Sequence, residues 1–180
     1  GLKRIGEGAF QFCESLEGFT IPASVDFMDA NAFEGSGLVE VNLATPGTVL
    51  RVVPSKAFYY CARLQSVALS NSLERICTGA FGYCENLVSV AIPPDSSVIV
   101  EDRAFFCCES LCCIQLAREG SIAQNAFRHC PPRLDVVHRF DSHPIHKLCY
   151  YASTTTAEEL RQAIADHKSS TPLQDQFGMT

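Results

Sequence analysis

Apolar positions recur along this chain in a fixed order, and each recurrence contains the pair Ala-Phe. Successive phenylalanines of these pairs are 23, 25, 23, 24 and 22 residues apart. The six pairs are Ala9-Phe10, Ala32-Phe33, Ala57-Phe58, Ala80-Phe81, Ala104-Phe105 and Ala126-Phe127. A unit of this length cannot bury an apolar face alone, so neighbouring units must stack. The repeat therefore predicts a solenoid.

Each repeat continues into a stretch in which apolar and polar residues alternate. The inward pairs are Phe19/Ile21, Val41/Leu43, Val67/Leu69, Val90/Ile92 and Ile114/Leu116. Alternation with a period of two predicts half-buried strands, which in register form a parallel sheet. A second short strand is expected before each Ala-Phe pair, as in residues 2–5, 50–53 and 73–76. The pair itself is expected in a short helical or 3₁₀ turn on the opposite side.

The full pattern, I-x-x-x-A-F-x-x-C-x-x-L-x-x-V-x-I-P, is clearest in residues 76–93. It resembles the BspA-type leucine-rich repeat family over about residues 1–140. The resemblance implies an α/β repeat solenoid, a strand-dominated leucine-rich-repeat horseshoe or right-handed coil of about six repeats. Two repeats depart from the pattern. Ser36 replaces the cysteine in the second, and Pro131-Pro132 precedes the leucine position in the sixth.

After residue 140 the repeat stops. Residues 143–148, His-Pro-Ile-His-Lys-Leu, resemble the ankyrin opening T-P-L-H-x-A. Thr155 and Glu158, like Thr156 and Glu159, have the spacing of a helix capping box. The resemblance implies an ankyrin-like helix pair over residues 141–167 that caps the solenoid or begins an ankyrin array. A flexible terminus is expected over residues 168–180.

Composition and charge indicate a globular chain and argue against nucleic acid or a membrane span. Hydrophobic residues make up 47% and charged residues 19% of the chain, as in an ordinary globular protein. The formal charge of -6 and the lack of a Lys/Arg cluster argue against nucleic-acid binding. No uncharged apolar stretch reaches the ~18 residues of a membrane span, so no transmembrane segment is expected. The chain starts at Gly1 within the pattern, and we expect it to belong to a longer protein.

The ten cysteines raise the question of disulfides or metal. Five occupy one repeat position, Cys13, Cys61, Cys84, Cys108 and Cys130. We expect them to be reduced core residues, because their Cβ vectors run parallel in neighbouring coils. A zinc site in residues 107–113 is disfavoured, because the four cysteines there point in different directions. His143, His146 and Cys149 spell H-x-x-H-x-x-C, a possible metal triad, but we favour structural roles for them.

Motifs of catalysis are missing from the sequence. It contains no Gly-rich phosphate loop, G-x-S-x-G elbow or H-E-x-x-H pair, so we expect neither enzyme activity nor a cofactor. The glutamates Glu14, Glu85 and Glu109 recur at one repeat position and are interpreted as a solvated edge. Outward strand positions form a candidate partner-binding face, although a plain solvated face fits equally well. They include Thr20, Glu40, Asn42, Ser66, Ser89 and Gln115.

The family resemblance implies a non-catalytic protein–protein interaction scaffold that uses an extended repeat surface. The alternative is a secreted or cell-surface adhesion module, which such repeats also form. A third hypothesis is a metal-dependent enzyme around His143, His146 and Cys149. Unpaired cysteines, the ankyrin-like tail and the lack of an N-x-[ST] signal favour an intracellular, cytoplasmic location. A secreted or cell-surface location is the alternative.

Overall fold

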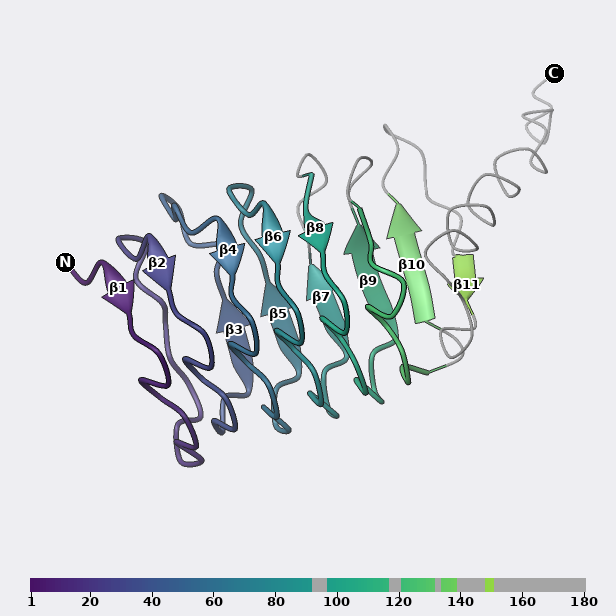
Figure 1. Cartoon of the computed structure of the whole chain (residues 1–180), viewed down its shortest axis with the longest axis horizontal. Helices are drawn as coiled ribbons and strands as arrows, with labels where there is room; N and C mark the ends of the chain where they lie inside the picture. The colour runs from purple at the N-terminus through teal and green to yellow at the C-terminus, as the bar shows by residue number, and fades with distance from the viewer. Residues whose placement is uncertain (92–96, 117–120, 132–133, 139–147, 151–180) are drawn as a thin grey trace, which may run out of the picture.

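The structure is a computed structural model that describes residues 1–91, 97–116, 121–131, 134–138 and 148–150. Within these ranges the chain consists of short strands joined by turns and loops. Successive coils lie side by side along the long axis of the molecule, from the N-terminus to β10 (Figure 1). The predicted solenoid is therefore confirmed as a strand-dominated one.

The main sheet contains β3 (Glu40–Asn42), β5 (Ser66–Ala68), β7 (Ser89–Ala91), β9 (Cys113–Leu116), β10 (Leu134–His138) and β11 (Leu148–Tyr150). Its order is β11-β10-β9-β7-β5-β3. Every neighbouring pair is parallel except β10 and β11, which are antiparallel. Val41, Val67 and Val90 stand in register and are buried, so the predicted alternation is confirmed.

A second set of strands lies on another side of each coil. The three-stranded sheet contains β4 (Val52–Val53), β6 (Arg75–Ile76) and β8 (Ile99–Val100), and β1 (Arg4–Ile5) pairs with β2 (Phe27–Met28). All of these pairs are parallel. In each strand the second residue is buried and the first is exposed. The second short strand predicted at residues 2–5, 50–53 and 73–76 is confirmed.

The Ala-Phe pairs form tight turns on the remaining edge of the solenoid, as predicted. In the Phe58 coil, the Tyr59 N–H donates to the Lys56 carbonyl at 3.1 Å, three residues back. The Phe58 N–H instead donates to the Ala80 carbonyl of the next coil at 2.8 Å. Because alternate N–H groups point along the axis, hydrogen bonding between coils continues around the turn. This geometry puts Lys56 and Tyr60 at φ values of 54° and 57°.

The core is a stack of phenylalanine rings inside these turns. Phe58 and Phe81 have ring centroids 5.2 Å apart with planes only 3° from parallel. The stack runs through Phe10, Phe33, Phe58, Phe81, Phe105 and Phe127. The alanine before each ring, from Ala32 onward, is buried and leaves room for the neighbouring backbone. The repeated phenylalanine thus forms one continuous core.

The repeat cysteines pack beside this stack, with one exception. Cys61, Cys84, Cys108 and Cys130 are buried, and each thiol lies 3.0–3.2 Å from a phenylalanine carbonyl of the preceding coil. Burial raises the pKa of Cys61 from 9.0 to about 11 and the pKa of Cys84 well above its ordinary value. The thiols of Cys61 and Cys84 therefore stay protonated at neutral pH. Cys13 is exposed in the described structure, so its expected burial is not confirmed there.

Two further expectations need correction. The strand expected around the inward pair Phe19/Ile21 is reduced to an isolated bridge between Gly18 and Glu40, in the first described coil. A helix through residues 148–150 is wrong, because these residues form β11. The free edge of β10 offers unpaired N–H and C=O groups, and β11 pairs with them.

The described residues contain no helix, so neither the α/β class nor the ankyrin-like helical cap is supported there. Residues 141–147 and 151–180 lie outside the described ranges. The domain boundaries at residues 140 and 167 therefore stay predictions. Among the described residues there is no helix with the length and apolar character that crossing a bilayer requires.

Candidate interaction surfaces

The predicted partner-binding face lies on the outward side of the main sheet. Strand register places Glu40 beside Ser66, Ser66 beside Ser89, and Ser89 beside Cys113. A second row runs through Asn42, Ala68, Ala91 and Gln115. The parallel sheet thus brings residues that are far apart in sequence into two straight rows. We call these two rows the sheet face.

Most of the predicted residues are accessible there. Thr20, Glu40, Asn42, Ser66 and Ser89 are exposed. Gln115 belongs to β9, but its side chain lies outside what the structure describes. The Asn42 side-chain oxygen accepts a hydrogen bond from the Ala44 N–H at 2.8 Å, which fixes it at the strand end. The described residues of the face have small or short polar side chains, with Glu40 as the acidic one. Rows of this kind suit an extended contact.

The cysteine and histidine motifs do not assemble a metal centre in the described part of the chain. No group of three or more His, Cys, Asp or Glu residues there is arranged to hold an ion. Cys107 is half-buried, Cys108 is buried and Cys112 is exposed, so the thiols of this segment diverge. Cys149 lies in β11, and His143 and His146 lie outside the described residues.

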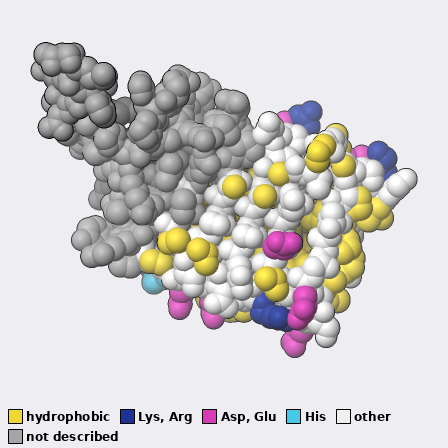
Figure 2. Space-filling view, turned by 180° about the vertical axis from the view of Figure 1, so that it is seen from behind, with side chains coloured by type: hydrophobic (Ala, Val, Ile, Leu, Met, Phe, Trp, Pro, Cys, Tyr) yellow, Lys and Arg dark blue, Asp and Glu magenta, His cyan; other side chains and the backbone are white. Residues whose placement is uncertain are grey.

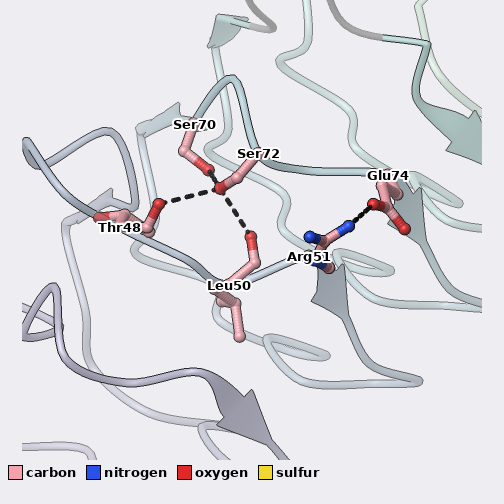
Figure 3. Close-up of polar contacts among 6 residues, drawn as sticks. All are labelled: Thr48, Leu50, Arg51, Ser70, Ser72 and Glu74. Carbon is pink, nitrogen blue, oxygen red and sulfur yellow. Dashed lines mark hydrogen bonds and ion pairs between the residues drawn. The ribbon is translucent and has the colours of Figure 1, made fainter.

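Many charged and hydroxyl side chains link one coil to the next. Arg51 pairs with Glu74, and the Ser72 hydroxyl lies 3.1 Å from the carbonyl oxygens of both Thr48 and Leu50 (Figure 3). Further ion pairs between coils join Arg4 to Asp29, Arg63 to Glu17 and Arg75 to Glu101. The Arg75 guanidinium and the Thr78 donors hold the pKa of Glu101 below its usual value. These groups serve packing between coils.

A second surface lies on the turn edge, and the sequence patterns did not reveal it. It consists of Tyr59, Tyr60, Tyr83, Phe106 and His129, which we call the aromatic ridge. Tyr60 and Tyr83 stack with centroids 4.6 Å apart and planes at 18°. Tyr83 meets Phe106 edge-on at 5.3 Å, and Phe106 meets His129 edge-on at 5.1 Å. The rings form one continuous row across four coils.

The ridge has charged borders. The Lys56 ammonium lies 5.4 Å from the Tyr59 ring centroid, and the Arg103 guanidinium lies 5.9 Å from that of Phe106. Partial burial, the largest cause, raises the pKa of Tyr59. On the face seen in Figure 2, hydrophobic side chains gather beside a histidine, and acidic side chains border this group. Aromatic residues and arginine are enriched at the cores of protein interfaces relative to other surfaces.

A signal for the ridge was present in the sequence. Its residues stand one or two positions after the repeated phenylalanine, as Tyr59 and Tyr60 follow Phe58. Comparing these two positions across repeats shows aromatic residues in consecutive coils. For strand residues, alternation in the sequence already predicts the direction of each side chain. The direction of turn residues follows only from backbone geometry, here the positive φ of Tyr60 and Tyr83.

Comparison with known proteins gives a family and a fold. The model of the BspA type leucine-rich repeat family matches residues 1–51 and 51–156 of this chain. It finds six copies of the repeat region. A leucine-rich repeat protein from Eubacterium ventriosum ATCC 27560 is 22% identical, with a TM-score of 0.63, over 77% of this chain and 35% of that one. A leucine-rich cell surface protein from Faecalibacterium prausnitzii A2-165 is 21% identical, with a TM-score of 0.51, over 79% of this chain and 44% of that one.

The chain thus spans less than half the length of these two structures. At such identities the likeness shows the fold alone. No curated protein matches the sequence.

Proposed function

The chain belongs to the BspA type leucine-rich repeat family, and from this premise we propose that it is a non-catalytic module that binds protein partners at a cell surface. The observation that carries the proposal is the sheet face. Its rows place Glu40, Ser66 and Ser89 side by side on exposed, parallel strands. A solenoid of this kind presents an extended surface that a shape-matched partner can cover.

The cell-surface location is supported by a structural neighbour described as a leucine-rich cell surface protein. The intracellular location that we expected is not supported. That expectation rested on unpaired cysteines, on the ankyrin-like tail and on the lack of an N-x-[ST] signal, and for the buried cysteines the structure offers a reason that needs no reducing compartment. The thiols of Cys84 and Cys108 are buried and directed at backbone carbonyls, so packing itself keeps them apart from oxidants.

A non-catalytic role is supported by the way the repeat arranges its residues. Repeats supply rows of like side chains, whereas catalysis needs one constellation of unlike groups. Several charged groups are also committed to ion pairs between coils, such as Arg75 with Glu101. Since no observation favours the metal-dependent enzyme hypothesis, we do not propose it. Metal analysis showing stoichiometric zinc or iron in the purified protein would revive it.

The sheet face is tested with the double variant Glu40→Arg plus Ser89→Arg. The control, Asp26→Arg plus Asn71→Arg, adds the same charge at exposed loop positions off the sheet face. Wild type, variant and control are applied to an array of purified extracellular proteins. We expect a partner that binds wild type and control alike and binds the sheet-face variant at least about tenfold more weakly. Equal binding to all three proteins would contradict the sheet-face proposal.

Location is tested separately on intact cells that produce the protein naturally. Protease added outside the cells should remove the repeat region, as followed with an antibody against it. A cytoplasmic control protein should survive the same treatment. If the repeat region survives as well, the cell-surface proposal is wrong, whatever the sheet face binds.

A further inference from the structure

We propose that Tyr60 and Tyr83 form an oxidative modification site, at which a one-electron oxidant of the peroxidase class joins the two rings into a dityrosine cross-link. The cross-link would tie the Phe58 coil to the Phe81 coil on the turn edge. It leaves the sheet face untouched, so the proposal does not rest on the proposed function. It rests on the distance, the orientation and the accessibility of the two rings.

The backbone holds the two rings side by side. Both residues stand two positions after the repeated phenylalanine of their coils and have φ values of 57° and 59°. The Tyr60 N–H donates to the Gly82 carbonyl at 2.9 Å, which fixes the spacing of the two turns. The ring centroids lie 4.6 Å apart with planes at 18°. Groups held in contact react far more readily than free ones, because the entropy of bringing them together is already lost.

Coupling of two phenols needs only an oxidant. Each tyrosine loses one electron and one proton, which leaves a radical shared between the phenolic oxygen and the ring carbons ortho to it. The two radicals join through a bond between one ortho carbon of each ring. The hydrogen on each joined carbon then moves to its phenolic oxygen, which restores both aromatic rings. One molecule of hydrogen peroxide, reduced to two of water, takes up the two electrons and the two protons.

Both rings are accessible, and Tyr60 is the more accessible one. Tyr60 is 48% exposed although it stacks on its neighbour, and Tyr83 is partly buried. An oxidant in solution can therefore reach both phenols. The exposed side of Tyr60 also gives its ring room to tilt toward Tyr83, as the new bond requires.

Tyr59 is close to both rings, but its orientation opposes coupling. Its plane lies at 80° to that of Tyr60 and at 83° to that of Tyr83. The new bond must lie in the plane of both rings, so nearly perpendicular rings have to turn first. Packing resists this turn, because a Cβ at Gly82 would come within 2.7 Å of the Tyr59 ring and the Lys56 ammonium lies 5.4 Å from its centroid. The stacked pair is therefore the one that couples.

Cys107 is the group that competes with the coupling. Its side chain is in hydrogen-bond contact with Tyr83, and a thiol can return a hydrogen atom to a tyrosyl radical. Burial, the largest cause, raises the pKa of the Cys107 thiol, so the thiol carries that hydrogen at neutral pH. A radical on Tyr83 thus either joins Tyr60 or is repaired by Cys107. Replacing the thiol should favour the cross-link.

The site is tested on the full chain with a haem peroxidase and hydrogen peroxide at low protein concentration. We expect a product with the mass of the 19.7 kDa monomer less two hydrogens and with the fluorescence of dityrosine. Trypsin should release residues 57–63 linked to residues 76–103, because these peptides carry Tyr60 and Tyr83. Mass spectrometry measures the yield of the linked peptides.

Single variants identify the rings that couple. Tyr60→Phe and Tyr83→Phe keep the stacked rings but remove one phenol, so each should lower the yield of the linked peptides at least about tenfold. Tyr59→Phe is the matched control from the same cluster and should leave the yield within about twofold. Cys107→Ser should raise the yield. A lower yield from Cys107→Ser would make Cys107 itself the radical partner and contradict the proposal.

Urea unfolding of the cross-linked monomer tests whether the bond forms from the native stack. The bond closes a loop between residues 23 positions apart, so the urea midpoint should rise above that of the untreated chain. A midpoint that does not rise would show that the bond formed in a distorted turn edge. Products linked mainly between two chains, or through residues 148–161 with Tyr150 and Tyr151, would also overturn the proposal. So would a loss of yield in Tyr59→Phe as large as that in Tyr60→Phe.

Discussion

At the scale of the residue, backbone geometry decides which side chains a position accepts. Each Ala-Phe turn has left-handed backbone two residues after its phenylalanine and, in five of the six coils, two residues before it, as at Tyr83 and Gly79 around Phe81. Lys56 and Arg103 occupy the position of Gly79 at φ values near 55°, so the chain accepts some strain there. Gly37 meets a different demand. Its N–H donates to the Cys13 carbonyl, and the neighbouring backbone lies directly against it.

The surroundings of these two glycines predict that adding a methyl group lowers the free energy of unfolding by different amounts. A Cβ on Gly79 would make only ordinary contacts, so Gly79→Ala should lose about 1 kcal/mol from the unfavourable φ alone. A Cβ on Gly37 would overlap the carbonyl oxygen of Glu14, and the backbone must move. We expect Gly37→Ala to lose at least about 3 kcal/mol in urea unfolding. Equal losses for the two variants would mean that the two coils do not approach so closely.

At the scale of the element, the strands are too short to hold the fold by themselves. The strands of the second sheet have two residues each, and β3, β5 and β7 have three. Stability must therefore come from what the strands and turns enclose, above all the phenylalanine stack. Phe81 lies between Phe58 and Phe105 at 5.2 and 5.3 Å and is fully buried. Phe10, at the end of the stack, is only partly buried.

This difference predicts a gradient in the cost of removing a ring. Phe81→Ala should lose about 3–5 kcal/mol, because it empties a closed space between two rings. Phe10→Ala should lose clearly less, since its ring is already partly in contact with water. Urea unfolding of both variants against wild type measures the difference. A loss from Phe10→Ala as large as that from Phe81→Ala would show that the first coil is covered in solution.

At the scale of the whole molecule, each coil packs on its neighbours, and the Arg63–Glu17 ion pair is a side-chain contact that reaches one coil further. Coils in the middle are covered on both sides, whereas the first coil has one neighbour in the described structure. Its exposed Cys13 and its single bridge at Gly18 reflect this. Repeat proteins of this kind gain stability from the interfaces between units. Their ends therefore open at lower free energy than their centres.

Hydrogen exchange should show this gradient along the axis. The amide of Phe58, bonded to Ala80 in the middle of the stack, should exchange much more slowly than that of Phe10, bonded to Ala32 at its end. Both bonds are short, at 2.8 and 2.7 Å, so bond geometry alone predicts no difference. Uniform protection would indicate that the solenoid opens only as one cooperative unit.

The sequence determined the features that depend on period alone. Spacing of the Ala-Phe pairs gave the solenoid, and alternation gave the direction of Val41, Val67 and Val90 and of the exposed residues between them. It also identified the repeat cysteines as core residues, because a residue that recurs in every coil has the same surroundings in each. Every one of these inferences holds in the interior coils, where each unit has two neighbours.

Only the tertiary structure decided the burial and the secondary structure of residues whose neighbouring coils or strands differ from those of the interior repeats. Cys13 has the same motif position as the buried repeat cysteines, yet it is exposed in the described structure, where its coil has one neighbour. Residues 148–150 form a strand because the edge of β10 offers hydrogen bonds, and pairing with an open edge outweighs a local resemblance to a helix. The aromatic ridge likewise depends on the positive φ of Tyr60 and Tyr83 and on the contact between consecutive coils. The period of the sequence determines the strands and core residues that all coils have in common. The aromatic ridge and the structure of the outermost strands depend on contacts between coils, and a single repeat does not contain both sides of such a contact.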